Sequence, residues 1–307
     1  MLIQWYPGHM HKAGREIKEA LSHADLAIEI LDARIPYSSE NPFLAKLRGD
    51  KPCLKVLNKC DLADPAVTAT WQAYFEQKKN VKTLAVNKEQ TGKIRFVTDL
   101  CQQLMPPDRT PDKLITALIM GIPNVGKSTL INILAGRAIA KTGDEPAVTK
   151  CQQRIAIGQN IVLLDTPGML WPNIDNRHSG YRLAATGGIK DTAISHEDVA
   201  TYVLEYLAAA YPQLLMARFN LSELSHTAQK ILADIGRKRG CLRAGGAVDA
   251  DKAGKIVLTE LRSGLLGTIS LETPAMMAEE LAELDLIRQA KAEKKQARKA
   301  RRKPSGP

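Results

Sequence analysis

Short apolar stretches recur through the first half of the chain, and they predict β-strands. Each stretch is bounded by polar or turn-forming residues, and most are separated by segments long enough for a helix. The predicted strands span 25–32, 53–57, 81–86, 114–120, 154–157 and 161–164. Strands that alternate with helices predict an α/β fold with a mostly parallel, doubly wound sheet.

The pattern changes after about residue 185, where apolar residues recur at helical spacing. The predicted helices span 197–210, 228–238 and 252–261, and a further amphipathic helix starts at 276. A basic, glycine-containing loop is predicted at 240–246. The expected domains are an α/β domain at 1–185, a small all-α domain at 186–272, and an amphipathic helix with a basic, disordered tail at 273–307.

The net charge of +10 lies mostly at the C-terminal end. Residues 288–303 hold nine Lys or Arg and one Glu, a local charge of +8. Such a run either solubilises a disordered chain end or contacts the phosphates of a nucleic acid. A second basic stretch, 237–243, lacks aromatic residues for base stacking, which favours recognition of RNA by its phosphates and shape.

Targeting and redox signals are absent from the sequence. No apolar stretch reaches the ~18 residues of a membrane span, and residues 1–12 lack the apolar region of a secretory signal. The five cysteines form no C-x-x-C pair, which favours free thiols in a reducing compartment. We therefore expect a cytoplasmic protein without membrane contact, and nothing in the sequence predicts an obligate oligomer.

Residues 121–128 read Gly-Ile-Pro-Asn-Val-Gly-Lys-Ser and fit the phosphate-binding motif G-x-x-x-x-G-K-[ST]. They lie between the predicted strand 114–120 and a predicted helix at 127–134, as the motif requires. Backbone N–H groups of such a loop face the phosphates, Lys127 reaches the β- and γ-phosphates, and the Ser128 hydroxyl binds Mg²⁺. The expected phosphate-binding residues are Asn124, Val125, Gly126, Lys127, Ser128 and Thr129.

A second motif, D-x-x-G, occupies residues 165–168 directly after the predicted strand 161–164. Asp165 can hold Mg²⁺ through a water molecule, and the N–H of Gly168 can contact the γ-phosphate and respond to its loss. Thr149 lies between the two motifs in a segment that can close over the metal, although an ordinary loop threonine is the alternative. The expected metal-binding residues are Ser128, Thr149 and Asp165.

The segment 58–61 reads Asn-Lys-Cys-Asp and follows the predicted strand 53–57. The carboxylate of Asp61 can accept hydrogen bonds from N1–H and the 2-amino group of guanine, whereas adenine would leave it unpaired. The stem of Lys59 can cover the base, and Asn58 can tie this loop to the phosphate loop. The residues expected to contact the base are Asn58, Lys59 and Asp61, with Val86 and Asn87 from a second loop. The motifs together predict binding of GTP and GDP and exclude an ATPase.

The base-recognition motif precedes the phosphate loop by about sixty residues, which reverses the order found in Ras-like GTPases. The same sheet can form if the usual termini are joined near 105–112 and the chain starts ahead of strand 25–32. The predicted fold is therefore an α/β P-loop GTPase domain with a circularly permuted, mostly parallel sheet, followed by the small all-α domain and the basic tail. In this order the D-x-x-G motif leads directly into the C-terminal domain, so movement near Gly168 can be passed to that domain.

This order and these motifs resemble the ribosome biogenesis GTPase A family of circularly permuted GTPases. The resemblance extends from the segment Ile-Gln-Trp-Tyr-Pro-Gly-His-Met at 3–10 to about Glu272, and it includes 188–192 and 196–200. It implies a cytoplasmic GTPase that binds the large ribosomal subunit and its rRNA, acts late in assembly of that subunit, and hydrolyses GTP to GDP. The C-terminal domain resembles the RNA-binding helical module of antiterminator proteins. One departure is Ala147, at a position where the family has glycine.

The motifs leave open which residue positions the attacking water. Ras-like enzymes have glutamine directly after D-x-x-G, but this chain has Met169, which cannot orient water. The resemblance implies that His9 takes this role, to which imidazole is suited near neutral pH; a purely structural histidine is the alternative. Asn124 matches a position that helps bind K⁺ in related GTPases, so the resemblance implies K⁺ beside Mg²⁺.

Two functions are consistent with these residues. The first is an assembly enzyme that couples GTP hydrolysis to release from a pre-ribosomal particle. The second is a GTP-sensing, RNA-binding regulator in which slow hydrolysis acts as a timer. Stimulation of GTP turnover by purified large subunits distinguishes the first function from the second.

Overall fold

A six-stranded sheet lies at the centre of the computed structural model, which describes residues 3, 5–110, 113–140 and 153–301. The strands are β1 (Leu26–Asp32), β2 (Cys53–Asn58), β3 (Val81–Val86), β4 (Ile115–Gly121), β5 (Gln153–Ile157) and β6 (Ile161–Asp165). Their order is β3-β2-β1-β4-β6-β5, and all neighbours are parallel except β5 and β6. The predicted α/β fold with a mostly parallel sheet is confirmed.

The central strands are buried along their whole length, which explains their continuous apolar pattern. Every residue of β1 and β2 is buried, because helices cover both faces of a parallel sheet. The edge strand β5 has only two of its five residues buried, Ile155 and Ile157. That alternation is the pattern of a strand with one face exposed to solvent.

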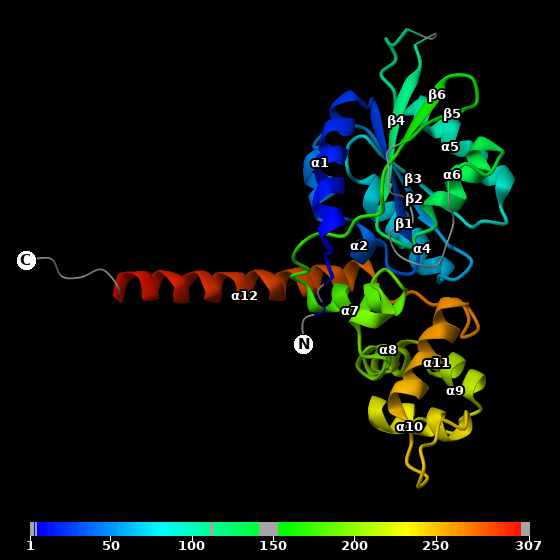
Figure 1. Cartoon of the computed structure of the whole chain (residues 1–307), viewed down its shortest axis with the longest axis vertical. Helices are drawn as coiled ribbons and strands as arrows, with labels where there is room; N and C mark the ends of the chain where they lie inside the picture. The colour runs from blue at the N-terminus through cyan, green and yellow to red at the C-terminus, as the bar shows by residue number, and fades with distance from the viewer. Residues whose placement is uncertain (1–2, 4, 111–112, 141–152, 302–307) are drawn as a thin grey trace, which may run out of the picture.

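Helices lie on both faces of this sheet (Figure 1). The helices of this part of the chain are α1 (Gly8–His23), α2 (Pro36–Ser39), α3 (Pro42–Arg48), α4 (Pro65–Glu76), α5 (Thr91–Gln103) and α6 (Lys127–Ala135). The chain moves outward from β1 to β3 through α3 and α4 and returns to β4 through α5. Right-handed connections that move in opposite directions along a sheet lie on opposite faces. Accordingly, α5 contacts α6 on one face, and α1 contacts α3 on the other.

After β6 the chain forms a group of helices beyond the sheet, here named the C-terminal helices (Figure 1). They are α7 (Arg177–Ala185), the short 3₁₀ helix η1 (Asp191–Ala193), α8 (His196–Ala210), α9 (Pro212–Phe219), α10 (Ala228–Lys238) and α11 (Ala250–Arg262). α8 contacts α7, α9, α10 and α11, and is therefore the central helix of the group. The helices predicted at 197–210, 228–238 and 252–261 correspond to α8, α10 and α11. The division of the chain after residues 185 and 272 stays a prediction.

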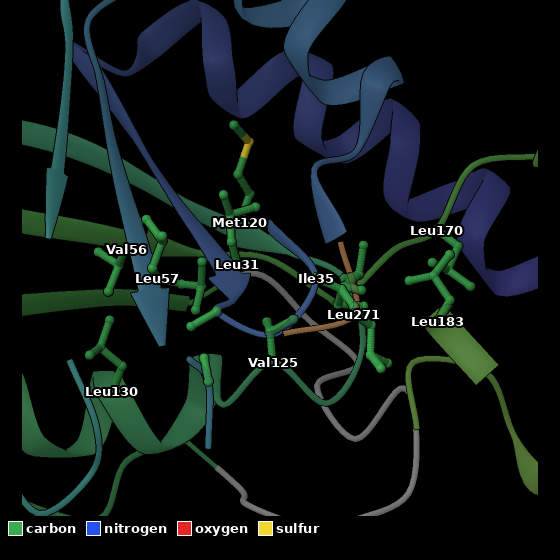
Figure 2. Close-up of a cluster of buried hydrophobic side chains, with 14 of the residues drawn as sticks. Leu31, Ile35, Val56, Leu57, Met120, Val125, Leu130, Leu170, Leu183 and Leu271 are labelled. Carbon is green, nitrogen blue, oxygen red and sulfur yellow. The ribbon is translucent and has the colours of Figure 1, made fainter. Parts of the chain in front are cut away.

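After α11 the chain returns to the α/β domain through residues 263–273, here named the connecting segment. The N–H of Leu271 donates to the carbonyl of Arg34 at 2.8 Å. Figure 2 shows the Leu271 side chain beside Ile35, just after the end of β1. The C-terminal helices are therefore joined to the α/β domain both where the chain enters them at α7 and where it leaves them after α11.

α12 (Pro274–Arg301) follows the connecting segment and extends away from the rest of the molecule (Figure 1). Met277 near its start is buried, whereas Leu286 is 67% exposed. The helix runs through the basic stretch as far as Arg301, where a disordered tail was expected. This stretch is rich in alanine, lysine and arginine, which are strong helix formers. Although α12 is long, neither it nor another helix in the described ranges is apolar enough to cross a membrane.

Candidate functional site

The predicted base-recognition, phosphate-binding and D-x-x-G motifs lie at one edge of the sheet. The carboxyl ends of the parallel strands lie at this edge, which is where open α/β sheets bind ligands. Asp32 at the end of β1 is in register with Asn58 of β2, and Asn58 is in register with Val86 of β3. β4 ends at Gly121, where the phosphate loop begins, and β6 ends at Asp165. Motifs that are far apart in the sequence therefore share one edge.

The base-recognition loop and the phosphate loop are joined by side-chain hydrogen bonds. Asn58 Nδ2 donates to the carbonyl of Val125 at 2.7 Å, and Lys59 Nζ donates to the carbonyl of Asn124 at 2.6 Å. Lys59 and Asn124 both have positive φ, 60° and 62°, a backbone conformation that costs energy in residues other than glycine. The two loops form one unit although 65 positions separate Lys59 from Asn124.

Two glycines allow backbone segments to approach closely at this edge. Gly126 has a φ of 88°, and a Cβ added there would lie 2.3 Å from Asn58 Nδ2. Gly168 of the D-x-x-G motif packs on the phosphate loop, where an added Cβ would lie 3.2 Å from Pro123 Cα. A side chain at Gly126 would therefore displace the asparagine that joins the two loops.

Lys127 and Asp165 form a buried ion pair at the phosphate loop. Lys127 Nζ donates to Asp165 Oδ1; burial lowers the pKa of Lys127, and the negative charge of Asp165 opposes that shift. The other carboxylate oxygen, Asp165 Oδ2, is buried and has no hydrogen-bond partner within the described residues. Such an oxygen needs a further partner, and a water bound to Mg²⁺ would supply one. Asp165 and the hydroxyl of Ser128, in the first turn of α6, fit the oxygen donors that Mg²⁺ prefers.

The residue that follows the D-x-x-G motif turns away from this edge. Thr166 Oγ1 donates to the carbonyl of Ile119 at 2.9 Å and anchors the motif to β4. The side chain of Met169 is fully buried, with its sulfur 4.0 Å from the hydroxyl of Tyr6. A Cβ added to Gly14 of α1 would lie 3.5 Å from the same sulfur. Met169 therefore belongs to the apolar contact between the motif and the N-terminal part of the chain.

The other predicted base and phosphate residues lie around the same edge. Asp61 is exposed, Val86 is buried, and Asn87, Ser128 and Thr129 are partly exposed. The N–H of Cys60 donates to the carbonyl of Val86 at 3.2 Å and joins the two base loops. Asn87 Oδ1 accepts hydrogen bonds from the N–H groups of Glu89 and Gln90, both at 3.0 Å. The Asn87 side chain thus stabilises the turn that leads into α5.

Two predicted residues have no described side chain. His9 lies in the first turn of α1, and its side chain is outside the part that the structure describes. Its neighbour Met10 is fully buried, so this turn is packed against the core. Thr149 lies in 141–152, outside the described residues.

Three polar contacts at the site were not anticipated. Asp32 accepts a hydrogen bond from Lys59 Nζ at 3.0 Å. Asn41 Nδ2 donates to the carbonyl of Met169 at 2.8 Å, and Asn124 Nδ2 donates to the carbonyl of Gly187 at 2.8 Å. The position of Asp32 at the end of a buried apolar strand is a usable sequence signal; the other contacts join segments whose proximity only the fold creates.

Known proteins are similar to this chain along most of its length. Residues 116–236 match a family model described as a 50S ribosome-binding GTPase. Ribosome biogenesis GTPase A of Bacillus cereus is 44% identical over 294 residues, which cover 94% of this chain and 99% of that protein. The GDP-bound structure of YlqF aligns with a TM-score of 0.63 and 26% identity over 85% of this chain and 100% of that chain. GNP-bound YlqF from T. maritima aligns with a TM-score of 0.63 and 28% identity over 86% of this chain and 98% of that chain.

The likeness spans nearly the whole length of both chains, and it includes the permuted order in which the base loop precedes the phosphate loop. A shared phosphate loop alone would match only the segment around β4 and α6. The chain belongs to the ribosome biogenesis GTPase A family of circularly permuted GTPases, and it is a GTP hydrolase.

Proposed function

We propose that this GTPase binds the large ribosomal subunit through its rRNA, acts late in assembly of that subunit, and works in the cytoplasm. The B. cereus relative is named for ribosome biogenesis, and the matching family model is described as ribosome-binding. The main observation in support of guanine-nucleotide binding is the pair of hydrogen bonds from Asn58 and Lys59 to the phosphate loop. These bonds join the predicted guanine-reading loop to the phosphate loop, which supports the binding of one nucleotide by both loops.

In this proposal each motif has a distinct role toward GTP. Asp61 accepts hydrogen bonds from guanine, and the exposure of its carboxylate supports that role. Lys127 leaves Asp165 for the β- and γ-phosphates when nucleotide binds, because a phosphate offers more negative charge than one carboxylate. Ser128 and Asp165 would hold Mg²⁺, Asp165 through water, and the ion would supply positive charge next to the phosphates.

The catalytic proposal concerns His9. Met169 is buried against Tyr6 and α1, so it is not available to orient water. The same contact brings the segment around His9 close to the D-x-x-G motif, which supports His9 as the residue that positions the attacking water when the subunit is bound.

K⁺ is a second proposed cofactor, and it depends on Asn124. The hydrogen bond from Asn124 Nδ2 to Gly187 orients this carboxamide at the phosphate loop, and an oxygen held there can help coordinate a monovalent cation beside the phosphates. Turnover should be faster in K⁺ than in Na⁺ buffer at equal ionic strength. Equal turnover in the two buffers would remove K⁺ from the mechanism.

The proposed RNA surface lies on the C-terminal helices and on α12. The side chains of Arg237 and Arg243 are 62% and 63% exposed, and a two-residue bridge between Leu242 and Val248 holds the loop that carries Arg243. α12 adds the basic run from Arg288. These side chains are suited to phosphate contacts, whose strength falls steeply with salt.

Sedimentation with purified large subunits tests the proposal. We expect co-sedimentation that depends on the nucleotide, with GDP and a non-hydrolysable GTP analogue giving different bound fractions. We also expect the subunits to raise GTP turnover. Absence of binding with both nucleotides would contradict the proposed function while leaving the GTPase assignment intact.

The His9→Ala variant tests the catalytic part. It should keep GTP binding and subunit binding but lose most of the stimulated turnover, by about 10²-fold or more for a general acid–base group. His23→Ala is the control, because His23 is an exposed histidine at the other end of α1. Unchanged stimulated turnover in His9→Ala would reject the role of His9.

A GTP-sensing, RNA-binding regulator is the second candidate. The burial of Met169 favours it, because a site without a built-in water-positioning residue hydrolyses GTP slowly. In that case subunits bind in a nucleotide-dependent way but do not raise turnover. The turnover measurement therefore separates the two candidates.

A further inference from the structure

A buried ion pair lies at the carboxyl end of β1, next to the base-recognition loop. Arg34 donates to Asp32 twice, from Nε to Oδ1 at 2.9 Å and from Nη2 to Oδ2 at 2.7 Å. The backbone N–H of Arg34 also donates to Asp32 Oδ1 at 3.1 Å. Both residues are almost completely buried, with Asp32 2% exposed and Arg34 1% exposed. The planar guanidinium therefore locks the orientation of the Asp32 carboxylate.

The same carboxylate holds the lysine of the base-recognition loop. Lys59 Nζ donates to Asp32 Oδ2 at 3.0 Å and to the carbonyl of Asn124 at 2.6 Å. These two acceptors lie on different elements, β1 and the phosphate loop, so they fix the end of the side chain from two sides. Asp32 is the charged one of these two acceptors, and charge-assisted hydrogen bonds are the stronger kind.

Arg34 is held in turn by the C-terminal part of the chain. Its Nη1 donates to the carbonyl of Leu261, in the last turn of α11, at 3.3 Å. Its own carbonyl accepts from the N–H of Leu271 in the connecting segment at 2.8 Å. The guanidinium and the peptide group of Arg34 thus both contact residues that lie more than two hundred positions further along the chain.

The connecting segment also touches the base-recognition loop directly. The N–H of Ile269 donates to the carbonyl of Leu62 at 2.9 Å. A Cβ added to Gly264 would lie 2.6 Å from Leu62 Cδ2. Leu62 follows Asp61, and its N–H donates to the carbonyl of Lys59 at 3.0 Å. The turn that carries the guanine-reading residues therefore rests on the connecting segment.

We propose that Asp32 and Arg34 are positioning residues of the guanine-nucleotide site, through which the C-terminal helices control the base-recognition loop. Arg34, held by α11 and the connecting segment, locks the carboxylate of Asp32, and Asp32 holds Lys59 where its stem covers the base. This inference rests on the proposed role of Lys59. The affinity for guanine nucleotides then depends on how the C-terminal helices pack against the α/β domain. By linkage, nucleotide binding changes that packing.

A double-mutant cycle on the full chain tests whether Asp32 acts through Lys59. Asp32→Asn should raise the Kd for a fluorescent GDP analogue about 10-fold or more, as expected for loss of a charge-assisted hydrogen bond. In a Lys59→Met background the same substitution should change the Kd less than about 2-fold, because the partner is already gone. Equal effects in both backgrounds would overturn the proposal.

Glu29→Gln is the matched control, because Glu29 lies on the same strand and forms a buried ion pair with Lys55 away from the nucleotide loops. It should lower stability but leave the Kd for GDP unchanged. A Glu29→Gln variant that weakens GDP binding as much as Asp32→Asn would show that the effect is general loss of packing, and would overturn the proposal.

Hydrogen exchange on the unmodified chain gives a second test. It needs no substitution, so misfolding of a variant cannot affect its result. GDP should slow exchange of the amides of Ile269 and Leu271, measured on peptides from the connecting segment, at least several-fold. Unchanged exchange there, with slower exchange in the phosphate loop, would overturn the link to the C-terminal helices. If the unmodified chain fails to bind GDP at all, the proposed nucleotide site itself is wrong. That result is distinguishable from an unexpected change in Kd or in hydrogen exchange, which contradicts only the positioning role.

Discussion

At the scale of single residues, the joining of the two nucleotide-binding loops depends on the close approach of the Gly126 backbone to the Asn58 side chain. Gly126 sits where any Cβ would strike Asn58 Nδ2. Asn58 uses that nitrogen to bond the carbonyl of Val125. One added carbon atom therefore acts on both nucleotide-binding loops together.

Gly126→Ala should abolish measurable GTP binding. The added Cβ would lie 2.3 Å from Asn58 Nδ2, and φ at this position is 88°, a conformation that alanine rarely adopts. Gly136→Ala is the control, because Gly136 also has positive φ, 65°, but faces open space at the end of α6. The control should lose about 1 kcal/mol of stability and bind GTP normally. Titration with a fluorescent GTP analogue measures both variants, and normal binding by Gly126→Ala would contradict the loop geometry.

Asp32 should contribute stability that depends on pH. Burial alone would raise its pKa, but the charges of Arg34 and Lys59 lower the pKa below its ordinary range. A carboxyl group whose pKa is lowered in the folded state stabilises the fold above its unfolded pKa of about 3.9, and that contribution is lost as the pH falls toward the folded pKa. The difference in free energy of unfolding between the unmodified chain and Asp32→Asn should therefore be larger at pH 7 than at pH 3. Urea unfolding at the two pH values measures it, and a difference independent of pH would contradict the ion pair.

At the scale of elements, polar caps and prolines determine where several helices begin. Asn41 and Asp64 accept hydrogen bonds from the first N–H groups of α3 and α4, and proline occupies the next position in each. α7 is capped in the same way by Asn176, and it also carries a buried arginine. Arg182 of this helix bonds the carbonyl of Leu271 at 2.9 Å, Glu272 at 3.3 Å and Glu280 of α12 at 2.5 Å.

Arg182→Ala should lower the free energy of unfolding by about 3–5 kcal/mol, because it leaves the buried carboxylate of Glu272 without its cation. Arg177→Ala, an exposed position on the same helix, should cost less than about 1 kcal/mol. Urea unfolding compares the two variants. Similar losses in both would mean that the contacts of Arg182 with the connecting segment and α12 add little to stability.

α12 should act in RNA binding and not in nucleotide binding. A chain that ends at Gln289 lacks eight of the nine basic residues of 288–303 but keeps Glu280 and its contact with Arg182. It should bind GDP normally, bind large subunits about 10-fold or more weakly, and show a shallower dependence of that affinity on salt. A chain that ends at Lys303 is the control. Equal salt dependence for the two truncated chains would exclude phosphate contacts by this helix.

At the scale of the whole molecule, the permuted order places the C-terminal helices against the nucleotide site. The chain enters these helices from the D-x-x-G motif and leaves them through the connecting segment, which rests on the base-recognition loop. In Figure 1 the two groups of elements meet around α2 and α7, where α12 also begins. The sheet and the C-terminal helices should therefore unfold together.

GDP at 100 times its Kd should raise the free energy of unfolding by about 2.7 kcal/mol, and it should shift one cooperative transition of the whole chain. Thermal unfolding followed by circular dichroism and by tryptophan fluorescence measures this, because Trp71 of α4 is buried against the connecting segment through a bond to the carbonyl of Glu272. Two transitions, with only one of them shifted by GDP, would contradict the joint unfolding.

The local sequence determined most of the elements and the identity of the nucleotide. The strands follow from continuous apolar stretches that a two-sided sheet must bury, and the motifs follow from the chemistry of phosphate and guanine. Their order along the chain was also readable without a structure, and it indicated the family that the comparisons then showed. Short helices such as α2 and α9 were missed, because four to eight residues carry too little periodic signal.

The tertiary structure alone decided which distant residues touch. Asp32 and Arg34 could be read as the polar end of a strand, but their contacts with Lys59, Leu261 and Leu271 depend on how the C-terminal helices fold back. The same is true of Met169, whose burial against Tyr6 cannot be inferred from its position after a motif. Local patterns encode local conformation and chemistry, whereas contacts between segments far apart arise only when the whole chain packs into one structure.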